Sequence, residues 1–356
     1  MAASVVHSFV DFVPSVFIGA PDSEDAISIL PGHRLLLEGR GMDAVKSAAT
    51  GSLVGACSAI VLAIPLQMVM STEIGDSIDG LAWTMALIAS SIIMLGCGHG
   101  VVARIWGLAA FCISGILGLM VDVLEIPCEG LLGEGTPMFP MLTGLFGIPV
   151  LLSGSGSSGI PRQMPAYDGD RGIMPGLRGV VMGCVSGWFP GITSTVGASM
   201  SSCVFRERNP EDFIANVASI GTVTSVLSIV ALSVSGSGRS GTAIVLRDLS
   251  GDMLYGVASS TFVLLLLATA VSSLIGYWMT IASGRAMSSL VPRIDTGMMN
   301  RAVLVLNVIL VLLLTGPFGI IILVVSTLIG LLPESSCTSR IVLCGCLLMP
   351  VLLQTI

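Results

Sequence analysis

The sequence predicts an all-α polytopic membrane protein with about eight to ten transmembrane segments, re-entrant hairpins and inverted repeats. Hydrophobic residues make up 53% of the 356 residues and charged residues only 10%, whereas soluble domains contain roughly 25% charged residues. Mean hydropathy is +0.96, and several apolar stretches approach the roughly 20 residues that a helix needs to cross a bilayer. The net charge of −7 argues against a nucleic-acid partner.

The stretch from Gly179 to Phe205 predicts a helical hairpin. Two apolar pieces of roughly a dozen residues meet at Phe189-Pro190-Gly191, and each piece is too short to cross the hydrocarbon core. Proline interrupts the helical hydrogen-bond pattern. Arginines lie on both sides of the stretch, so the positive-inside rule places both of its ends in the cytoplasm. We therefore expect a re-entrant hairpin; the alternative is one long helix kinked at Pro190.

The other apolar stretches follow a consistent topology. They are, in chain order, residues 2–18, 48–70, 81–96, 105–121, 138–152, 213–233, 257–281, 302–332 and 341–353. With these spans, twelve of the fifteen Lys and Arg residues fall inside, Arg239 and Arg247 fall outside, and Arg340 stays undecided. This sorting is what the positive-inside rule predicts. The stretch 302–332 contains Thr315-Gly316-Pro317 and is either a second hairpin or a kinked span.

A weak internal repeat divides the chain. Ala26-Ile27-Ser28-Ile29-Leu30 and Ala243-Ile244-Val245-Leu246, 217 residues apart, each follow a loop of small residues and precede a long apolar stretch. Because the first loop is predicted inside and the second outside, the copies would be inverted, as in many secondary transporters. The predicted units are a first membrane repeat (1–152) whose N-terminal hairpin is missing, a Gly/Ser-rich cytoplasmic linker (153–178), a second repeat (179–283) and C-terminal membrane helices (284–356).

The hairpin tip is the first candidate binding site, because transport requires polar groups deep in the membrane. Pro190 and Gly191 form the break, and glycine lets the backbone approach a ligand closely. Thr193, Ser194 and Thr195 supply hydroxyls beside the N–H groups of a helix start, which suit a carboxylate or a phosphate. The alternative is a packing seam of small residues.

Two loops supply further candidates. In the loop Ser237, Gly238, Arg239 and Ser240, the arginine is suited to pairing with an anionic substrate, or is simply solvated. In the equivalent loop of the first repeat, the acidic cluster Asp22, Glu24 and Asp25 is suited to a coupling proton or sodium ion, because neighbouring carboxylates raise one another's proton affinity. The alternative for this cluster is an ordinary helix N-cap at Asp22 or Ser23.

No catalytic or cofactor motif is recognisable. The sequence contains no nucleotide-binding Gly-Lys motif, no zinc-protease His pair and no nucleophile elbow, so we expect neither an enzyme nor a pump ATPase. Seven of the nine cysteines lie in or beside apolar segments without metal-ligand spacing, which is typical of packing residues. We therefore expect no metal and no cofactor.

The hairpin sequence FPGITSTVGASM and the following Asn209-Pro210-Glu211-Asp212-Phe213 resemble the TctA-like permeases, the large membrane subunit of tripartite tricarboxylate transporters, and especially their archaeal relatives. Thr315-Gly316-Pro317-Phe318-Gly319 is also similar to that family. The resemblance covers most of the chain, with departures at the missing first hairpin and at Asp22. It implies a multi-pass carrier of organic anions driven by an ion gradient, which works with a small membrane subunit and an extracytoplasmic binding protein. Archaeal relatives often lack these partners.

The sequence thus predicts a secondary transporter of a small organic anion such as a carboxylate, working by alternating access in the cell membrane. Its expected partners are membrane lipid and the anionic substrate, with a small membrane subunit, a binding protein or a second copy of the chain as further possibilities. One alternative is a translocase for polyprenyl-phosphate lipid carriers on the same fold. Another is a membrane scaffold that transports nothing.

Overall fold

The computed structural model describes residues 1–18, 29–72, 81–96, 101–124, 127–131, 133–153, 161–167, 172–189, 192–205, 207, 209–235, 246, 254, 256–291, 296–335 and 338–354. The regular structure of these residues is helical except for one small antiparallel sheet, formed by β1 (Glu129–Gly130) and β2 (Gly133–Glu134). Five described helices are long and apolar enough to cross a membrane, and four shorter apolar helices accompany them. The all-α polytopic membrane fold is therefore confirmed.

The first half of the chain forms α1 (Ala2–Val10), α2 (Phe12–Ile18), α3 (Ile29–Leu37), α4 (Gly41–Met70), α6 (Ala82–Gly96), α7 (Val101–Val123), α8 (Met138–Leu142), the π-helix η1 (Thr143–Gly147) and α9 (Ile148–Ser153). The second half forms α10 (Ile173–Trp188), α11 (Ser194–Phe205), α12 (Pro210–Ser235), α14 (Ser260–Leu290), α15 (Thr296–Gly330), α16 (Leu332–Ser335), the 3₁₀-helix η5 (Arg340–Cys344) and α17 (Gly345–Gln354). Each predicted apolar stretch lies in one of these helices or in a consecutive set of them.

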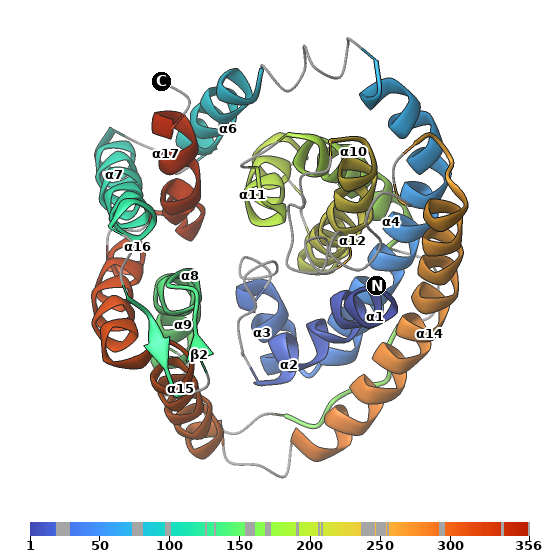
Figure 1. Cartoon of the computed structure of the whole chain (residues 1–356). Coiled ribbons are helices and arrows are strands. Elements are labelled where there is room, and N and C mark those ends of the chain that lie inside the picture. The colour runs from blue at the N-terminus through green and yellow to red at the C-terminus, as the bar shows by residue number, and fades with distance from the viewer. Residues whose placement is uncertain are drawn as a thin grey trace.

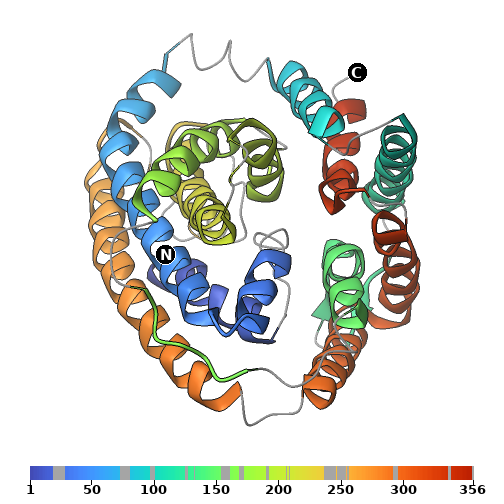
Figure 2. The same ribbon diagram turned by 180° about the vertical axis from the view of Figure 1, so that it is seen from behind.

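The helices gather into two lobes (Figure 1). The hairpin lobe contains α1 to α4, α10 to α12 and α14; the second lobe contains α6 to α9, α15 to α17 and the small sheet. Figure 2 shows the same grouping from behind. Each lobe combines helices from both halves of the chain, so the lobes do not coincide with the predicted sequence units.

Helices α4 and α12 of the hairpin lobe run in the same direction. Gly51 of α4 faces Ala215 of α12, and Gly55 faces Ser219, so the two sequences advance together along the contact. A β-carbon on Gly51 would lie only 2.7 Å from the carbonyl carbon of Ala215, which means that the two backbones touch. Such contacts between small residues allow helices to pack closely in lipid, where apolar side chains gain little by leaving the hydrocarbon.

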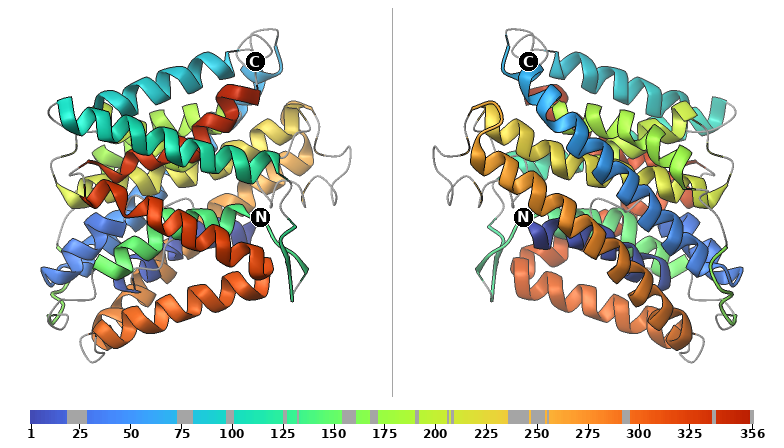
Figure 3. Two further views of the ribbon diagram at one scale, coloured as in Figure 1. Left: turned by 90° about the vertical axis from the view of Figure 1, so that its left-hand side faces the viewer. Right: turned by 90° about the vertical axis from the view of Figure 1, so that its right-hand side faces the viewer.

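Helix α10 joins this seam through a row of glycines. Gly183 faces Val223 and Gly187 faces Leu227 of α12, so α10 is also parallel to α12. Helix α14 runs the other way, because Gly284 near its end faces Val45 near the start of α4. The starts of α4, α10 and α12 and the end of α14 therefore lie at one end of the molecule (Figure 3). We call this the basic end, since Arg40, Lys46, Arg178 and Arg285 lie there; the positive-inside rule assigns it to the cytoplasm.

Helix α15 breaks at Gly316, which has φ of 67° and ψ of −163°. This left-handed backbone suits glycine, and the following Pro317 cannot continue the helical hydrogen-bond pattern. Figure 3 shows the two halves folding back beside each other. Val311 before the break and Leu323 after it belong to one buried cluster, whereas a straight helix would separate them by about 18 Å. Of the two predicted possibilities for this stretch, the hairpin is correct.

The small sheet packs against this break. Glu129 of β1 lies against Gly316, and Gly130 lies against the carbonyl groups of Leu313 and Leu314. These contacts cover backbone groups that the end of a helix leaves without intrahelical partners. The sequence did not predict the sheet, because each of its strands is only two residues long.

Candidate functional site: the α10–α11 hairpin

Helices α10 and α11 form a hairpin and not a single kinked helix. Helix α10 ends at Trp188, Phe189 has an extended backbone (φ −80°, ψ 125°), and α11 begins at Ser194. Gly197 of α11 faces Ser186 of α10 near the tip, while Arg178 reaches Glu207 at the open end. The two helices are therefore antiparallel, and both ends of the stretch lie at the basic end.

The tip of this hairpin stops short of the far end of α12. Gly187, in the last turn of α10, lies level with Leu227 of α12, and α12 continues to Ser235. The remaining residues of α12 extend about 12 Å at the helical rise of 1.5 Å per residue. The start of α11 thus lies inside the helical assembly, as a re-entrant hairpin requires; re-entry into the bilayer itself stays a prediction.

The start of α11 presents hydroxyl groups. Thr193 caps the helix, since its Oγ1 accepts a hydrogen bond from the Val196 amide at 3.4 Å, and threonine is one of the residues preferred at this position. The side chain of Thr193 is exposed, whereas Ser194 is 5% exposed and Thr195 is 1% exposed. No described residue forms a hydrogen bond with the Ser194 hydroxyl. The donor and acceptor sites of this hydroxyl are therefore available to a ligand.

Helix α11 also connects the two lobes. Ile192, Val196 and Met200 pack in one apolar cluster with α6 and η5 of the second lobe. Within this contact the Ser199 hydroxyl lies 3.2 Å from the Cys344 sulfur. The base of the hairpin therefore packs within the hairpin lobe, while α11 contacts the second lobe.

Ion pairs and amides hold the base of the hairpin. Arg178 binds both carboxylate oxygens of Glu207, at 2.9 and 3.1 Å, and the side chain of Glu207 is only 4% exposed. The Asn216 amide of α12 donates to Glu207 at 3.5 Å and accepts from Ser201 of α11 at 2.9 Å. This network fixes both hairpin helices to α12.

We expect Arg178→Gln to destabilise the protein by about 1–3 kcal/mol, because it leaves the buried Glu207 carboxylate without its cation. Thermal unfolding of the purified protein in detergent measures the effect. The double variant Arg178→Gln/Glu207→Gln should recover part of the loss, since neither charge then remains unpaired. If the double variant is less stable than Arg178→Gln alone, the ion pair is not what holds the base.

A second network at the basic end was not predicted from the sequence. Arg40, just before α4, pairs with Asp43 at 2.9 Å and with Glu211 of α12. Asp43 also accepts from the Tyr167 amide at 2.8 Å. Burial alone would lower the pKa of Arg40, but the two carboxylates outweigh it and raise that pKa overall. The only sequence signal was the placement of charged residues next to apolar spans, which does not identify partners.

Most of the other predicted site residues cannot be placed. Among the described residues, the structure brings together Thr193, Ser194 and Thr195. The others lie outside the described residues: Pro190, Gly191, Ser237, Gly238, Arg239 and Ser240 of the predicted substrate site, and Asp22, Glu24 and Asp25 of the predicted ion site. Their roles stay predictions. No group of three or more His, Cys, Asp or Glu side chains that could hold a metal occurs in the part of the chain that the structure describes.

The sequence model of the Tripartite tricarboxylate transporter TctA family matches residues 1–345. The chain belongs to the TctA family. The uncharacterized protein MJ1079 of Methanocaldococcus jannaschii is 28% identical over 273 residues, which are 74% of this chain and 66% of that protein, slightly under two thirds of its length. No solved structure matches the chain. TctA is a transporter family and not an enzyme family. Because this chain belongs to that family and has five described helices that are long and apolar enough to cross a membrane, it is a multi-pass membrane protein.

Proposed function

We propose that this TctA-family chain is a secondary transporter of a small organic anion, driven by an ion gradient and working by alternating access in the cell membrane. The observation that carries the proposal is the start of α11, where Ser194 is 5% exposed and no described residue forms a hydrogen bond with its hydroxyl. This start lies between the two lobes and short of the far end of α12. A transported ligand has to bind at such a depth.

The chemistry of this position suits an anion. A helix start carries unpaired N–H groups and a partial positive charge, and hydroxyls beside it donate hydrogen bonds to carboxylate oxygens. Because the surroundings are apolar, each of these bonds is stronger than it would be in water. Arg239, which the sequence predicts at a substrate site, would add a full positive charge, and Asp22, Glu24 and Asp25 would hold the coupling ion.

The proposed alternating mechanism uses the two inverted repeats that the sequence predicts. In the proposed scheme the first copy consists of α1 to α9, and the second consists of α12, α14, α15 and α17 with the α10–α11 hairpin before it, so the C-terminal helices belong to the second copy. Helices α4 and α14 then correspond, and they run in opposite directions. The two halves of α15 correspond to α6 and α7, and α17 corresponds to α8 and α9.

Two pairs of helix contacts support this proposed correspondence, because a two-fold axis would turn each contact into its equivalent in the other copy. Helix α17 packs on α7, where Gly118 faces Cys346. The equivalent pair is α9 with the second half of α15, where Gly330 faces Pro149. Similarly, α4 packs on α12, while α14 packs on α1 through Gly276 and Phe9. Copies related in this way exchange their environments when the transporter changes the side to which its site opens.

In tripartite systems, TctA proteins work with a binding protein and a small membrane subunit. For this chain we propose the same class of partners, and a dimer remains a further prediction. Tricarboxylates are the first substrates to test, since they are named in the description of the family.

We expect Ser194→Ala to raise the KM for the transported anion about tenfold or more, because a hydrogen bond to a charged group contributes roughly 1.5–3 kcal/mol. The measurement is uptake of labelled anions into proteoliposomes under an imposed proton or sodium gradient. Citrate-like carboxylates and phosphate-bearing compounds are the probes. Ser202→Ala on the same helix is the matched control, since its hydroxyl donates to the Ser199 carbonyl at 2.7 Å, away from the helix start.

The outcomes separate the alternatives. Gradient-dependent carboxylate uptake that weakens in Ser194→Ala and not in Ser202→Ala supports the proposal. Transfer of only polyprenyl-phosphate compounds would favour the lipid-carrier translocase. The absence of uptake for every probe, in protein that is correctly folded, would favour the scaffold. Equal KM values in Ser194→Ala and Ser202→Ala would show that Ser194 is not part of the binding site.

A further inference from the structure

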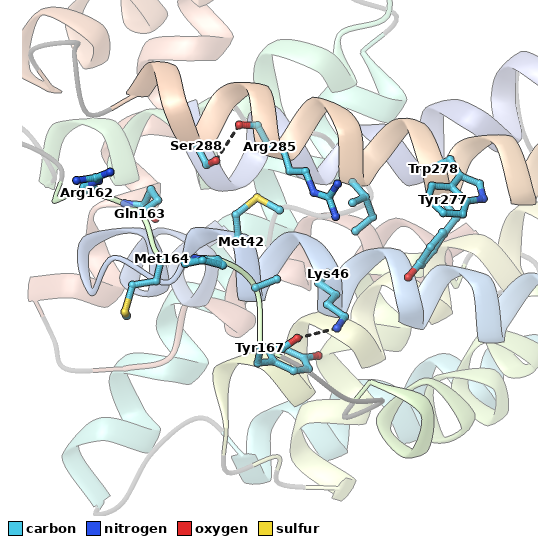
Figure 4. Close-up of a pocket in the computed structure, with 13 residues that line it drawn as sticks. Met42, Lys46, Arg162, Gln163, Met164, Tyr167, Tyr277, Trp278, Arg285 and Ser288 are labelled. Carbon is cyan, nitrogen blue, oxygen red and sulfur yellow. Dashed lines mark hydrogen bonds between the residues drawn. The ribbon is translucent and has the colours of Figure 1, made fainter.

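A cavity of about 980 Å³ lies at the basic end of the hairpin lobe, away from the hairpin tip. Its walls come from the first turns of α4, the last turns of α14 and the irregular segment 161–167 between the two halves of the chain (Figure 4). These three segments are far apart in sequence, so inspection of the sequence alone did not identify the site.

The lining is cationic. Lys46, Arg162 and Arg285 line the cavity, and none of the described residues that line it is acidic. Among the described residues, none of these three cations forms an ion pair with a carboxylate. The Arg285 guanidinium points into the space beside Met42 and Lys46 (Figure 4). Nearby Arg40, by contrast, is neutralised by Asp43 and Glu211.

The position of Lys46 is fixed by the 161–167 segment. Its ammonium donates to the Tyr167 carbonyl at 2.7 Å and lies 4.9 Å from the centre of the Tyr167 ring. An ammonium has three N–H donors, so one carbonyl leaves donors available for a ligand. The contact with the aromatic ring adds cation–π attraction and keeps the charge at the cavity.

The cavity continues into the lipid-facing surface of α14. Leu264, Leu267, Val271 and Leu274 are 57–66% exposed and recur at helical spacing, so they form one apolar stripe along the helix. The stripe ends at Trp278, which is 69% exposed and lines the cavity together with Tyr277. Exposed tryptophan and tyrosine are typical of the membrane–water interface. The cavity therefore lies at the headgroup level, and the stripe lies at the level of the acyl chains.

We propose that this cavity binds the headgroup of an anionic membrane lipid from the cytoplasmic leaflet. The phosphate accepts hydrogen bonds from Lys46 and Arg285, and the lipid tail lies along the α14 stripe. Arg162, on the 161–167 segment, contributes a third positive charge at the cavity mouth. The bound lipid thereby links α4, α14 and that segment. A water-soluble anion would gain the same charges but nothing from the stripe, and this difference favours the lipid.

The test is lipid binding to the purified full chain, measured by native mass spectrometry and by thermal unfolding in detergent. The probes are phosphatidylglycerol, phosphatidylcholine and the soluble headgroup glycerol phosphate. Each lysine or arginine near an anionic membrane surface contributes roughly 1 kcal/mol, which is about fivefold in affinity. Lys46→Gln/Arg285→Gln should therefore weaken phosphatidylglycerol binding about 20-fold or more.

Arg104→Gln/Arg301→Gln is the matched control, because both arginines are exposed at helix starts outside the cavity and the change in net charge is the same. It should bind phosphatidylglycerol like the unaltered chain. Should the Lys46 variant fold poorly, Arg285→Gln alone should weaken binding about fivefold, since the Arg285 side chain makes no ion pair with a described carboxylate. Equal affinities in the cavity and control variants would overturn the proposal, as would equal binding of phosphatidylcholine. Stabilisation by glycerol phosphate as strong as that by phosphatidylglycerol would identify a site for soluble anions and also overturn it.

Discussion

Replacing Gly51 by leucine is expected to prevent α4 and α12 from packing and to lower the stability of the protein by about 3 kcal/mol or more. A β-carbon at this position would lie 2.7 and 2.8 Å from backbone atoms of Ala215. Backbone atoms of a neighbouring helix cannot rotate away as a flexible side chain can, so the helices must separate. Separation would also disturb Gly55 and Ser219 one turn further along the same contact.

The measurement is the yield of monodisperse protein after size exclusion and its unfolding temperature in detergent. Gly51→Ala should be intermediate, because it adds the clashing β-carbon and nothing more. Val61→Leu is the matched control on the same helix: Val61 is 74% exposed, so an added methylene meets lipid or detergent. Normal unfolding of Gly51→Leu would show that α4 and α12 are not in backbone contact.

Local features of the sequence predicted the apolar helices and the α10–α11 hairpin. A proline-glycine break between two short apolar pieces predicted the α10–α11 hairpin, and the hydroxyl residues from Thr193 to Thr195 predicted the start of α11, because both effects depend on neighbouring residues. For Thr315 to Gly319 the same reasoning left a hairpin and a kinked span open. The sequence does not show whether the two halves of α15 fold back beside each other. That arrangement depends on their contacts with the small sheet and with α9.

Long-range packing could not be predicted in the same way. Glycines in α10 indicated close helix contacts but not that Gly183 would face Val223, because small residues pack against any compatible surface. The helix boundaries differ for a related reason. Helix α4 begins at Gly41 and not at residue 48, since its first turns carry the charged residues Asp43 and Lys46, which both form hydrogen bonds with the distant Tyr167. Hydropathy detects only the apolar part of a helix and misses first turns that carry charged residues.

Grouping into lobes has a mechanistic consequence. If the substrate site at the start of α11 opens alternately to the two sides, the hairpin lobe has to move relative to the second lobe, because rigid helices cannot change the access of a site by themselves. The contact of α11 with α6 and η5 lies on this boundary. A covalent bond across that contact is therefore the most direct probe of the mechanism.

Ser199→Cys is expected to allow a disulfide with the native Cys344 that abolishes transport. The Ser199 hydroxyl lies 3.2 Å from the Cys344 sulfur, so a cysteine sulfur at that position reaches bonding distance after a small rotation. The disulfide would join α11 of the hairpin lobe to η5 of the second lobe. Uptake into proteoliposomes should fall to background after oxidation with copper phenanthroline and return after reduction with dithiothreitol.

The same variant without Cys344, Ser199→Cys/Cys344→Ala, is the control and should transport equally before and after oxidation. Peptide mapping by mass spectrometry confirms that the bond has formed. The unaltered chain under the same oxidant shows whether its own cysteines, such as Cys203, contribute. A fully cross-linked protein that still transports at the rate of its reduced form would show that α11 and η5 do not separate during the cycle. Alternating access would then require movement of α11 together with η5, and the boundary between moving parts would lie elsewhere than between these lobes.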